Sequence, residues 1–165
     1  STHSYQPTAR DTELLRVIEL LSPTSEQMLK WTECFQEPIR PFTQIGDLRR
    51  RLGKLHAVGL VRRWRLAIES QGMTPYYYKL TLEGHRALHG KDAEPRRSRA
   101  FSPIGLSLHS HTKALADFIV HTKVAAHRIG ATLTETYAEN EYRVTVGDES
   151  LKLDGRFTLL RSVVP

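Results

Sequence analysis

The sequence predicts an α+β protein: a helical N-terminal half that ends in a two-stranded hairpin, then a smaller unit of one helix and antiparallel strands. Three observations support this prediction. Several segments before residue 60 carry apolar residues at every third or fourth position, the spacing of amphipathic helices. Short runs rich in valine, tyrosine and threonine follow after residue 60 and again after residue 130. A further helical pattern fills residues 104–129 between them.

The composition limits the class of protein. With 165 residues and 39% hydrophobic content, the chain can form one fair-sized domain or two small ones. No apolar run approaches the roughly 18 residues that cross a bilayer, and no secretory signal is visible, so we expect a cytoplasmic protein with no membrane partner. A single cysteine, Cys34, excludes an internal disulfide and a multi-cysteine zinc site. Its apolar surroundings favour a buried side chain over a nucleophile.

The first helix is predicted over residues 11–21. Residues 1–10 show no apolar periodicity and are predicted to form an N-terminal arm. Leucine, valine and isoleucine then recur at helical spacing, with Thr8 or Asp11 as the candidate N-cap. A Ser-Pro step ends the pattern, because proline cannot continue a helix.

A second helix is predicted after Thr24 or Ser25, either of which can serve as its N-cap. We expect Trp31 in this helix to be a core aromatic rather than a platform for a ligand. Pro38 and Pro41 separate the helix from the next one.

Residues 43–58 predict a third helix with two different faces. The apolar face consists of Ile45, Leu48, Leu52 and Leu55, and the opposite face of Thr43, Gly46, Asp47, Arg50 and Lys54. Thr43 is the candidate N-cap, and Gly59 is the predicted stop. Gly46 and Gly53 either allow a partner to approach the backbone or relieve crowding against the second helix.

Two strands joined by a polar turn follow the third helix. The predicted strands are residues 60–70 and 76–80, and residues 71–75 form the turn between them. Thr81 is then the candidate cap of a short helix over residues 82–89, which a glycine ends.

Positive charge is concentrated in the third helix and the strand after it. Between Ile39 and Leu66 there are eight basic residues and one acid, Asp47, which gives this segment a net charge of +7 in a chain of +6 overall. A segment that binds phosphates concentrates charge in this way, because each neutralised phosphate releases counterions. The alternative is that these arginines are only solvated.

The sequence RRRLGKLHAVGLVRRWR, followed by PYYYKLTLEGHRAL, resembles the winged-helix signature of many bacterial regulators. The resemblance predicts a winged helix-turn-helix over residues 11–90, with the third helix in the major groove of double-stranded DNA and the hairpin on phosphates. Arg50 or Arg51 would then pair with guanine, and Gln44 with adenine. The implied groove contacts are Thr43, Gln44, Asp47, Arg50, Arg51 and Lys54, and the implied backbone contacts are Arg62, Arg63 and Lys79.

The remaining chain is predicted to form a linker and a separate unit. Residues 91–103 are basic and either lie along DNA or are mobile. Residues 104–165 then give one long helix that ends at Gly130, followed by strands at 131–137, 142–146 and 151–160, with a turn at 147–150. Many such regulators dimerise through a C-terminal helix, so a homodimer is left open.

The order of these parts resembles the bacterial and plasmid-borne replication-relaxation family. A helix that opens with His111-Thr112 and the final segment LKLDGRF carry the resemblance, although Leu153 stands where that family has proline. The family's C-terminal half looks like a degenerate restriction-endonuclease-like fold in which acids and a Glu-x-Lys hold a metal. The acids implied here are Glu135, Glu139 or Glu141, together with Asp154. No Glu-x-Lys follows Asp154, so we expect no catalysis.

The sequence therefore predicts a non-enzymatic protein that binds double-stranded DNA, in transcriptional regulation or in plasmid replication and mobilisation. We expect no cofactor and no bound metal. One alternative is a metal-dependent nuclease that the winged helix targets to DNA, and another is a winged helix that binds a protein. A metal site made of His109, His111 and His121 is a further hypothesis, which requires the first two to be locally extended.

Overall fold

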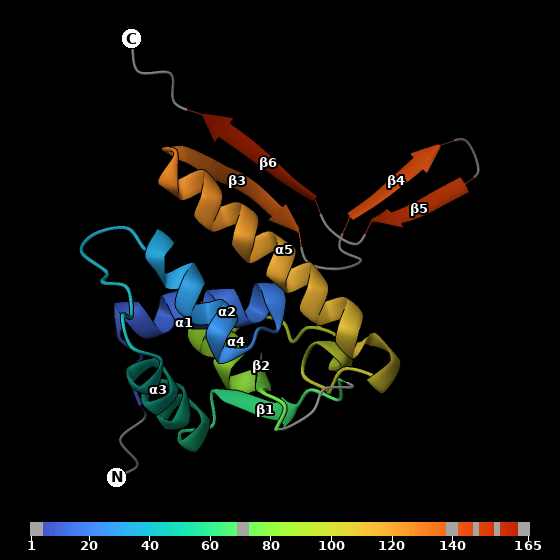
Figure 1. Ribbon diagram of the computed structural model, residues 1–165. Helices are drawn as coiled ribbons and strands as arrows, with labels where there is room; N and C mark the ends of the chain where they lie inside the picture. Colours follow the sequence, from blue (N-terminus) through green and yellow to red (C-terminus); the bar gives the residue numbers. More distant parts are fainter. Residues whose placement is uncertain (1–4, 69–72, 138–141, 147–148, 154–155, 162–165) are drawn as a thin grey trace.

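The chain is an α+β protein, and the computed structural model describes residues 5–68, 73–137, 142–146, 149–153 and 156–161 (Figure 1), with side chains up to residue 131. Its N-terminal half consists of helices and one β-hairpin, which lies between α3 and α4. The elements in order are α1 (Ala9–Leu21), α2 (Ser25–Trp31), η1 (Thr32–Cys34), α3 (Ile45–Ala57), β1 (Val61–Arg65), β2 (Tyr76–Leu80) and α4 (Leu82–His89). The predicted second strand and short helix are confirmed residue for residue, whereas β1 ends five residues before the predicted boundary.

The C-terminal half contains one long helix and two antiparallel strand pairs. Its elements are η2 (Ser98–Ala100), η3 (Leu106–Leu108), α5 (His109–Arg128), β3 (Ala131–Tyr137), β4 (Tyr142–Val146), β5 (Glu149–Leu153) and β6 (Arg156–Arg161). β3 pairs with β6, and β4 pairs with β5. The prediction of one strand over residues 151–160 is wrong, because that run is divided between β5 and β6, which pair with different partners.

The first two helices begin with reciprocal side-chain caps. The Thr8 hydroxyl accepts a hydrogen bond from the Asp11 amide, and the Asp11 carboxylate accepts one from the Thr8 amide. Thr24 and Gln27 form the same arrangement at α2. Two predicted caps are thus confirmed. The predicted Thr43 cap of α3 is wrong: Gln44 occupies the N-cap and its side chain makes no capping bond.

One hydrophobic core joins the N-terminal half to α5. Leu14 and Ile18 of α1 and Leu52 of α3 are almost fully buried, and Ile119 and Val120 of α5 belong to the same cluster. The sequence pattern had placed this long helix with the C-terminal strands. In the structure α5 packs on β3 and also on α2 and η1 of the N-terminal half (Figure 1).

Each face of the hairpin β1–β2 buries one tyrosine of β2. Tyr78 on one face lies in the core, whereas Tyr77 on the other face stacks on Trp64, with ring centroids 5.7 Å apart. His109, at the start of α5, meets the Tyr77 ring edge-on. Its Nδ1 accepts a hydrogen bond of 2.8 Å from the Ala67 amide, and its Nε2 lies 2.9 Å from the Ile104 carbonyl oxygen. Because both ring nitrogens serve the fold, His109 is not available for the hypothetical histidine metal site.

Two glycines set the junction between α3, the hairpin and α4. Gly59 ends α3 in the left-handed region at φ 81°, a conformation that residues with a Cβ rarely adopt. Gly84 of α4 lies directly against Leu60, where a Cβ would overlap the carbonyl oxygen. Thr81 caps α4 and also donates a hydrogen bond to the Gly59 carbonyl. No helix in the described part of the chain is long and apolar enough to cross a bilayer.

Candidate nucleic-acid interface

α3 presents one side to the core and the other to solvent, as its sequence predicts. Leu48, Leu52 and Leu55 are fully buried. The opposite side is exposed and includes Thr43, Gln44, Gly46, Asp47, Arg50 and Lys54. In the described part of the chain, no element packs over this exposed side.

A hollow of about 540 Å³ lies beside this exposed side of α3. It brings together five of the predicted contact residues, namely Thr43, Asp47, Arg50, Arg51 and Lys54. Its remaining walls come from Thr8 and Arg10, which were predicted to lie in an N-terminal arm, and from Pro41 and Phe42. The start of α1 and the approach to α3 therefore extend the surface beyond the predicted helix.

Arg10 is a basic residue of this hollow that sequence reasoning missed. It lies in the first turn of α1, where its guanidinium covers the Phe42 ring at 3.4 Å and donates a hydrogen bond of 2.8 Å to the Pro41 carbonyl. Burial lowers the pKa of Arg10, and the nearby charge of Arg51 adds to this effect. Positive charge is thus more concentrated here than the basic run in α3 alone indicates.

Arg51 is held inside the fold. Its guanidinium donates hydrogen bonds to both carboxylate oxygens of Asp11 and one of 2.7 Å to the Tyr5 hydroxyl. Burial alone would raise the pKa of Asp11, but hydrogen bonds from Arg51, Tyr5 and the Thr8 amide outweigh it and lower the pKa to about 2. Burial and the bond to Asp11 raise the pKa of Tyr5 to about 12. The Arg51 guanidinium therefore makes three hydrogen bonds within the fold, while 26% of the side chain stays exposed.

The other cations of α3 differ in their freedom. Arg50 is 80% exposed and makes an ion pair with Asp47 at 3.0 Å. Arg49 points toward α2, where it pairs with Glu26 at 2.7 Å. Lys54 lies 5.3 Å from the Tyr5 ring centroid and remains exposed. Of the two arginines predicted to pair with guanine, only Arg50 has a side chain that extends into solvent.

The strand β1 exposes three arginines, each supported by an aromatic ring. Arg62 covers Trp64 at 4.9 Å, and Arg63 and Arg65 cover Tyr76 at 4.5 and 3.9 Å. Arg65 was not among the predicted contacts. The alternation of arginine with aromatic residues in the hairpin is the sequence feature that would have indicated it.

Lys79 pairs with Arg62 across the hairpin, but its ammonium group is bound within the fold. Its ammonium group donates hydrogen bonds of 2.9 Å to the carbonyl oxygens of Arg99 and Ser102. Burial lowers the pKa of Lys79, and the neighbouring charge of Arg99 lowers it further. Lys79 thus fastens part of the predicted linker, residues 91–103, to the hairpin.

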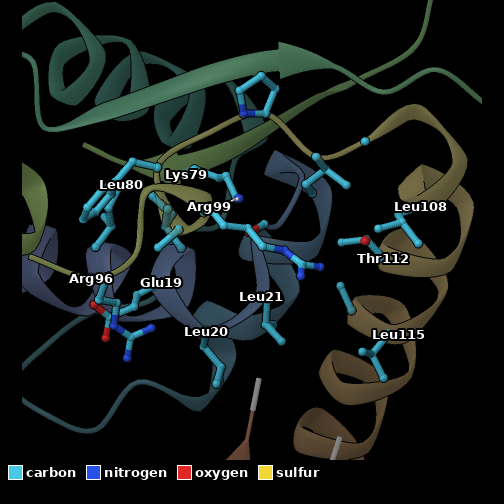
Figure 2. A pocket seen from close by; sticks show the side chains of 18 of the residues that line it. Glu19, Leu20, Leu21, Lys79, Leu80, Arg96, Arg99, Leu108, Thr112 and Leu115 are labelled. Atoms are coloured by element: carbon cyan, nitrogen blue, oxygen red, sulfur yellow. Dashed lines mark hydrogen bonds between the residues drawn. The ribbon is translucent and has the colours of Figure 1, made fainter. Parts of the chain in front are cut away.

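A second cavity, of about 320 Å³, lies between α1, the segment before α5 and α5 itself (Figure 2). Leu20, Leu21 and Leu115 supply apolar walls, and Arg96 and Arg99 supply basic groups (Figure 2). The basic part of the predicted linker therefore borders a cavity distinct from the hollow beside α3.

The acidic residues considered for a nuclease are not placed by the structure. Glu135 belongs to β3, but its side chain is outside the described part of the chain. Glu139, Glu141 and Asp154 also lie outside the described residues. The metal site that the resemblance implies stays a hypothesis.

The described fold is thus an α+β protein with a basic surface formed by one helix and one hairpin. A family model described as replication-relaxation matches residues 18–158. The match spans most of the 165 residues, so the chain belongs to the replication-relaxation family, as its sequence pattern predicts. Comparisons with curated proteins and with solved structures gave no significant match.

Proposed function

We propose that this protein binds double-stranded DNA as a winged helix-turn-helix, with α3 in the major groove and the hairpin β1–β2 as the wing. The observation that carries the proposal is the exposed basic side of α3, which borders a hollow lined by Arg10, Arg50 and Lys54. The major groove is about 12 Å wide and admits one α-helix, so this side suits it.

The exposed residues divide into two roles. Gln44 is the N-cap of α3 and Arg50 lies in its N-terminal half, the half that reads base edges in this class of fold. Arg50 would pair with guanine once it exchanges Asp47 for the base. We assign phosphate contacts to Arg10, Lys54, Arg62, Arg63 and Arg65. Arg51 and Lys79 are positioning residues in this proposal, because their side chains bind other parts of the fold.

The glycines of α3 support close approach by a partner. A Cβ built at Gly46 or Gly53 would meet no described atom within 4 Å, so packing against α2 does not require either glycine. Glycine in a helix costs roughly 0.5–1 kcal/mol relative to alanine. Close approach of a DNA backbone to α3 would explain why glycine is present at these positions despite that cost.

Membership of the replication-relaxation family supports a role in plasmid replication or mobilisation. The second proposed role is regulation of transcription, which uses the same kind of DNA contact. We propose that the protein acts by binding rather than by catalysis. The alternative is a nuclease, which would cleave the bound DNA when Mg²⁺ is added.

The proposal is tested by fluorescence anisotropy of the full chain with duplex DNA across a salt series. An Arg50→Ala/Lys54→Ala variant should bind at least about tenfold more weakly, and each phosphate that the variant no longer neutralises should reduce the salt slope by about 0.9. The matched control is Arg16→Ala/Arg128→Ala, which removes the same charge from exposed positions outside the proposed surface and should bind like wild type.

The other outcomes identify the alternatives. Equal losses in both double variants would mean that net charge alone drives binding. Absence of binding at low salt would indicate a protein partner. Cleavage of the duplex after Mg²⁺ is added would support the nuclease, whereas intact DNA would support a binding protein.

A further inference from the structure

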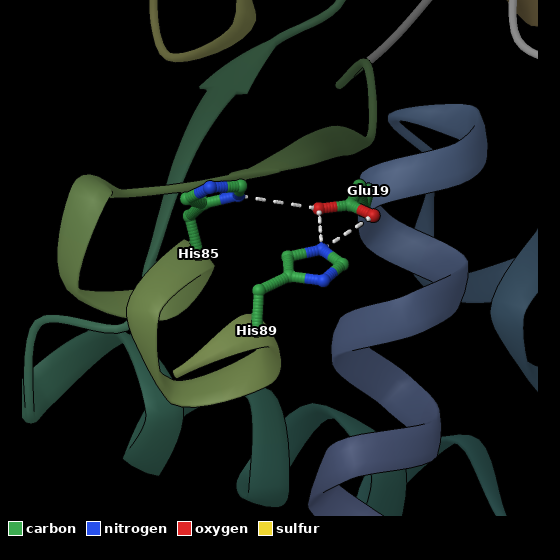
Figure 3. Close-up of side chains that lie close together, drawn as sticks. All are labelled: Glu19, His85 and His89. Carbon is green, nitrogen blue, oxygen red and sulfur yellow. Dashed lines mark hydrogen bonds and ion pairs between the residues drawn. The ribbon is translucent and has the colours of Figure 1, made fainter. Parts of the chain in front are cut away.

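We propose that Glu19, His85 and His89 form a site for a divalent transition-metal ion of the zinc class, which joins α1 to α4. Figure 3 shows the two imidazole rings and the carboxylate turned toward one another. One ligand atom from each of the three residues lies within 4.8 Å of the other two. None of the three residues belongs to the proposed DNA surface, so the inference is independent of the proposed function.

The two histidines share one face of α4. They are four residues apart, which places their side chains on successive turns of the same side of a helix. Their ring centroids lie 4.7 Å apart. Glu19 reaches them from the C-terminal half of α1 (Figure 3), so the site depends on how these two helices pack.

The distances fit a tetrahedral ion. One carboxylate oxygen of Glu19, Oε2, lies 3.6 Å from Nδ1 of His85 and 2.8 Å from Nε2 of His89. Zinc bonds of about 2.0–2.2 Å at tetrahedral angles place two ligand atoms about 3.4 Å apart. The two measured distances differ from this value by about 0.2 Å at His85 and about 0.6 Å at His89. A bound ion would therefore replace the present hydrogen bond between His89 and Glu19 and move these two side chains apart.

His85 is the observation that points to a cation. Its Nε2 lies 3.0 Å from the Glu94 carbonyl oxygen, which can only accept, so Nε2 carries the hydrogen. In the neutral tautomer that has this hydrogen, the lone pair of Nδ1 points toward the Glu19 carboxylate, which is also an acceptor. His85 is only 5% exposed, and its Nδ1 has no hydrogen-bond partner among the described residues. A cation between Nδ1 and the carboxylate would satisfy both atoms.

The surroundings of His85 also match a metal ligand. A metal-bound histidine usually donates its other N–H to a carbonyl or carboxylate, which fixes the ring and its tautomer. The Glu94 carbonyl fills that position here. Two imidazoles and one carboxylate suit zinc and its neighbours, whereas calcium and magnesium require more oxygen ligands than Glu19 supplies.

The site is accessible from solvent through His89, whose side chain is 39% exposed, while that of Glu19 is 18% exposed. Three protein ligands leave a fourth position for water. A bound ion would fasten α4 to α1 beside Gly84, the residue that packs on Leu60 at the end of α3. An ion bound here would thus hold α1 and α4 together near the base of the hairpin.

Metal binding is measured on the tag-free full chain by calorimetric titration with zinc, and cobalt is then used as a spectroscopic probe. We expect one zinc per chain, a higher thermal midpoint with zinc, and the visible absorption of tetrahedral cobalt. His89→Ala and Glu19→Gln should each weaken zinc binding at least about tenfold, a loss that changes to outer-shell partners can already cause. The matched control, His121→Ala on the exposed side of α5, should bind like wild type.

The proposal is overturned if zinc does not bind at micromolar concentration, or if binding survives both His89→Ala and Glu19→Gln. An equal loss in the His121→Ala control would also overturn it, because the metal would then bind surface histidines in general. His85→Ala leaves a gap in a buried position and can unfold the chain. The two more exposed ligands therefore decide the outcome.

Discussion

The Asp11 carboxylate at the start of α1 accepts two hydrogen bonds from the guanidinium of Arg51 in α3. Asp11 is fully buried, while the Arg51 side chain is 26% exposed. The pair fixes how α3 lies against α1 and so determines the direction of the exposed side of α3. Arg50, the adjacent residue, extends into solvent beside the same hollow. We therefore expect these consecutive arginines to have separable effects, Arg50 on the proposed DNA binding and Arg51 on folding.

Arg51→Ala should destabilise the fold by about 3 kcal/mol, because it leaves the buried charge of Asp11 without its partner. Arg50→Ala should change the free energy of unfolding by less than about 0.5 kcal/mol, as expected for an exposed pair. Urea unfolding of both variants measures the difference. In DNA binding the order should reverse, with Arg50→Ala relaxing the sequence preference. Equal effects of the two substitutions in both assays would contradict the separation.

The Asp11 carboxylate should make stability depend on pH in the acid range. Its pKa is lowered to about 2 in the folded chain from an ordinary value of 3.8. A group with a depressed folded pKa stabilises the fold above its unfolded pKa, and this contribution is lost as pH falls toward the folded value. We expect a loss of about 2 kcal/mol between about pH 4 and pH 2. Urea unfolding at several pH values tests this, and Asp11→Asn should show a smaller dependence in that window.

Replacing Gly46 in α3 should change the stability of the chain and its DNA affinity in opposite directions. Gly46→Ala meets no described atom within 4 Å and should stabilise the chain by roughly 0.5–1 kcal/mol, because alanine favours the helix. If DNA approaches α3 at this exposed position, the same substitution should weaken DNA binding. Thermal unfolding and anisotropy of one preparation measure both effects. Unchanged DNA affinity would show that the DNA backbone does not approach this position.

Local patterns in the sequence predicted the local structure well. Thr8 and Thr24 were identified as caps because a cap needs only a hydroxyl three residues before the amide that it binds. The bounds of β2, α4 and β3 follow from turn residues and strand-forming runs. Thr43 was misassigned as a cap because both it and Gln44 precede α3, and the sequence does not give the residue at which the helix begins.

Contacts between distant segments were not predictable from these patterns. Helical periodicity shows that α5 has an apolar side, but it does not show which element covers that side. The pair of Asp11 with Arg51 spans forty residues, and no local rule connects them. For the proposed metal site, the spacing of His85 and His89 was visible in the sequence, whereas Glu19 becomes a neighbour only when α4 packs on α1.

The burial of α5 yields a prediction that can be tested by the same isoleucine-to-alanine substitution at two positions of different exposure. Ile119 is 3% exposed and belongs to the shared core, whereas Ile129, at the C-terminal end of the same helix, is 62% exposed. Ile119→Ala should destabilise the chain by about 2–5 kcal/mol, because it removes a buried side chain and leaves a cavity. Ile129→Ala should cost less than about 0.5 kcal/mol.

Urea unfolding, followed through tryptophan fluorescence, reports on the N-terminal half because Trp31 and Trp64 both lie there. If α5 belonged to an independent C-terminal unit, Ile119→Ala would leave this transition unchanged, and deletion of residues 104–165 would leave a folded remainder. We instead expect the deletion to unfold the N-terminal half, since it uncovers the apolar side of α2. Whether the protein is a homodimer is therefore better tested by sedimentation of the intact chain than of a truncated one.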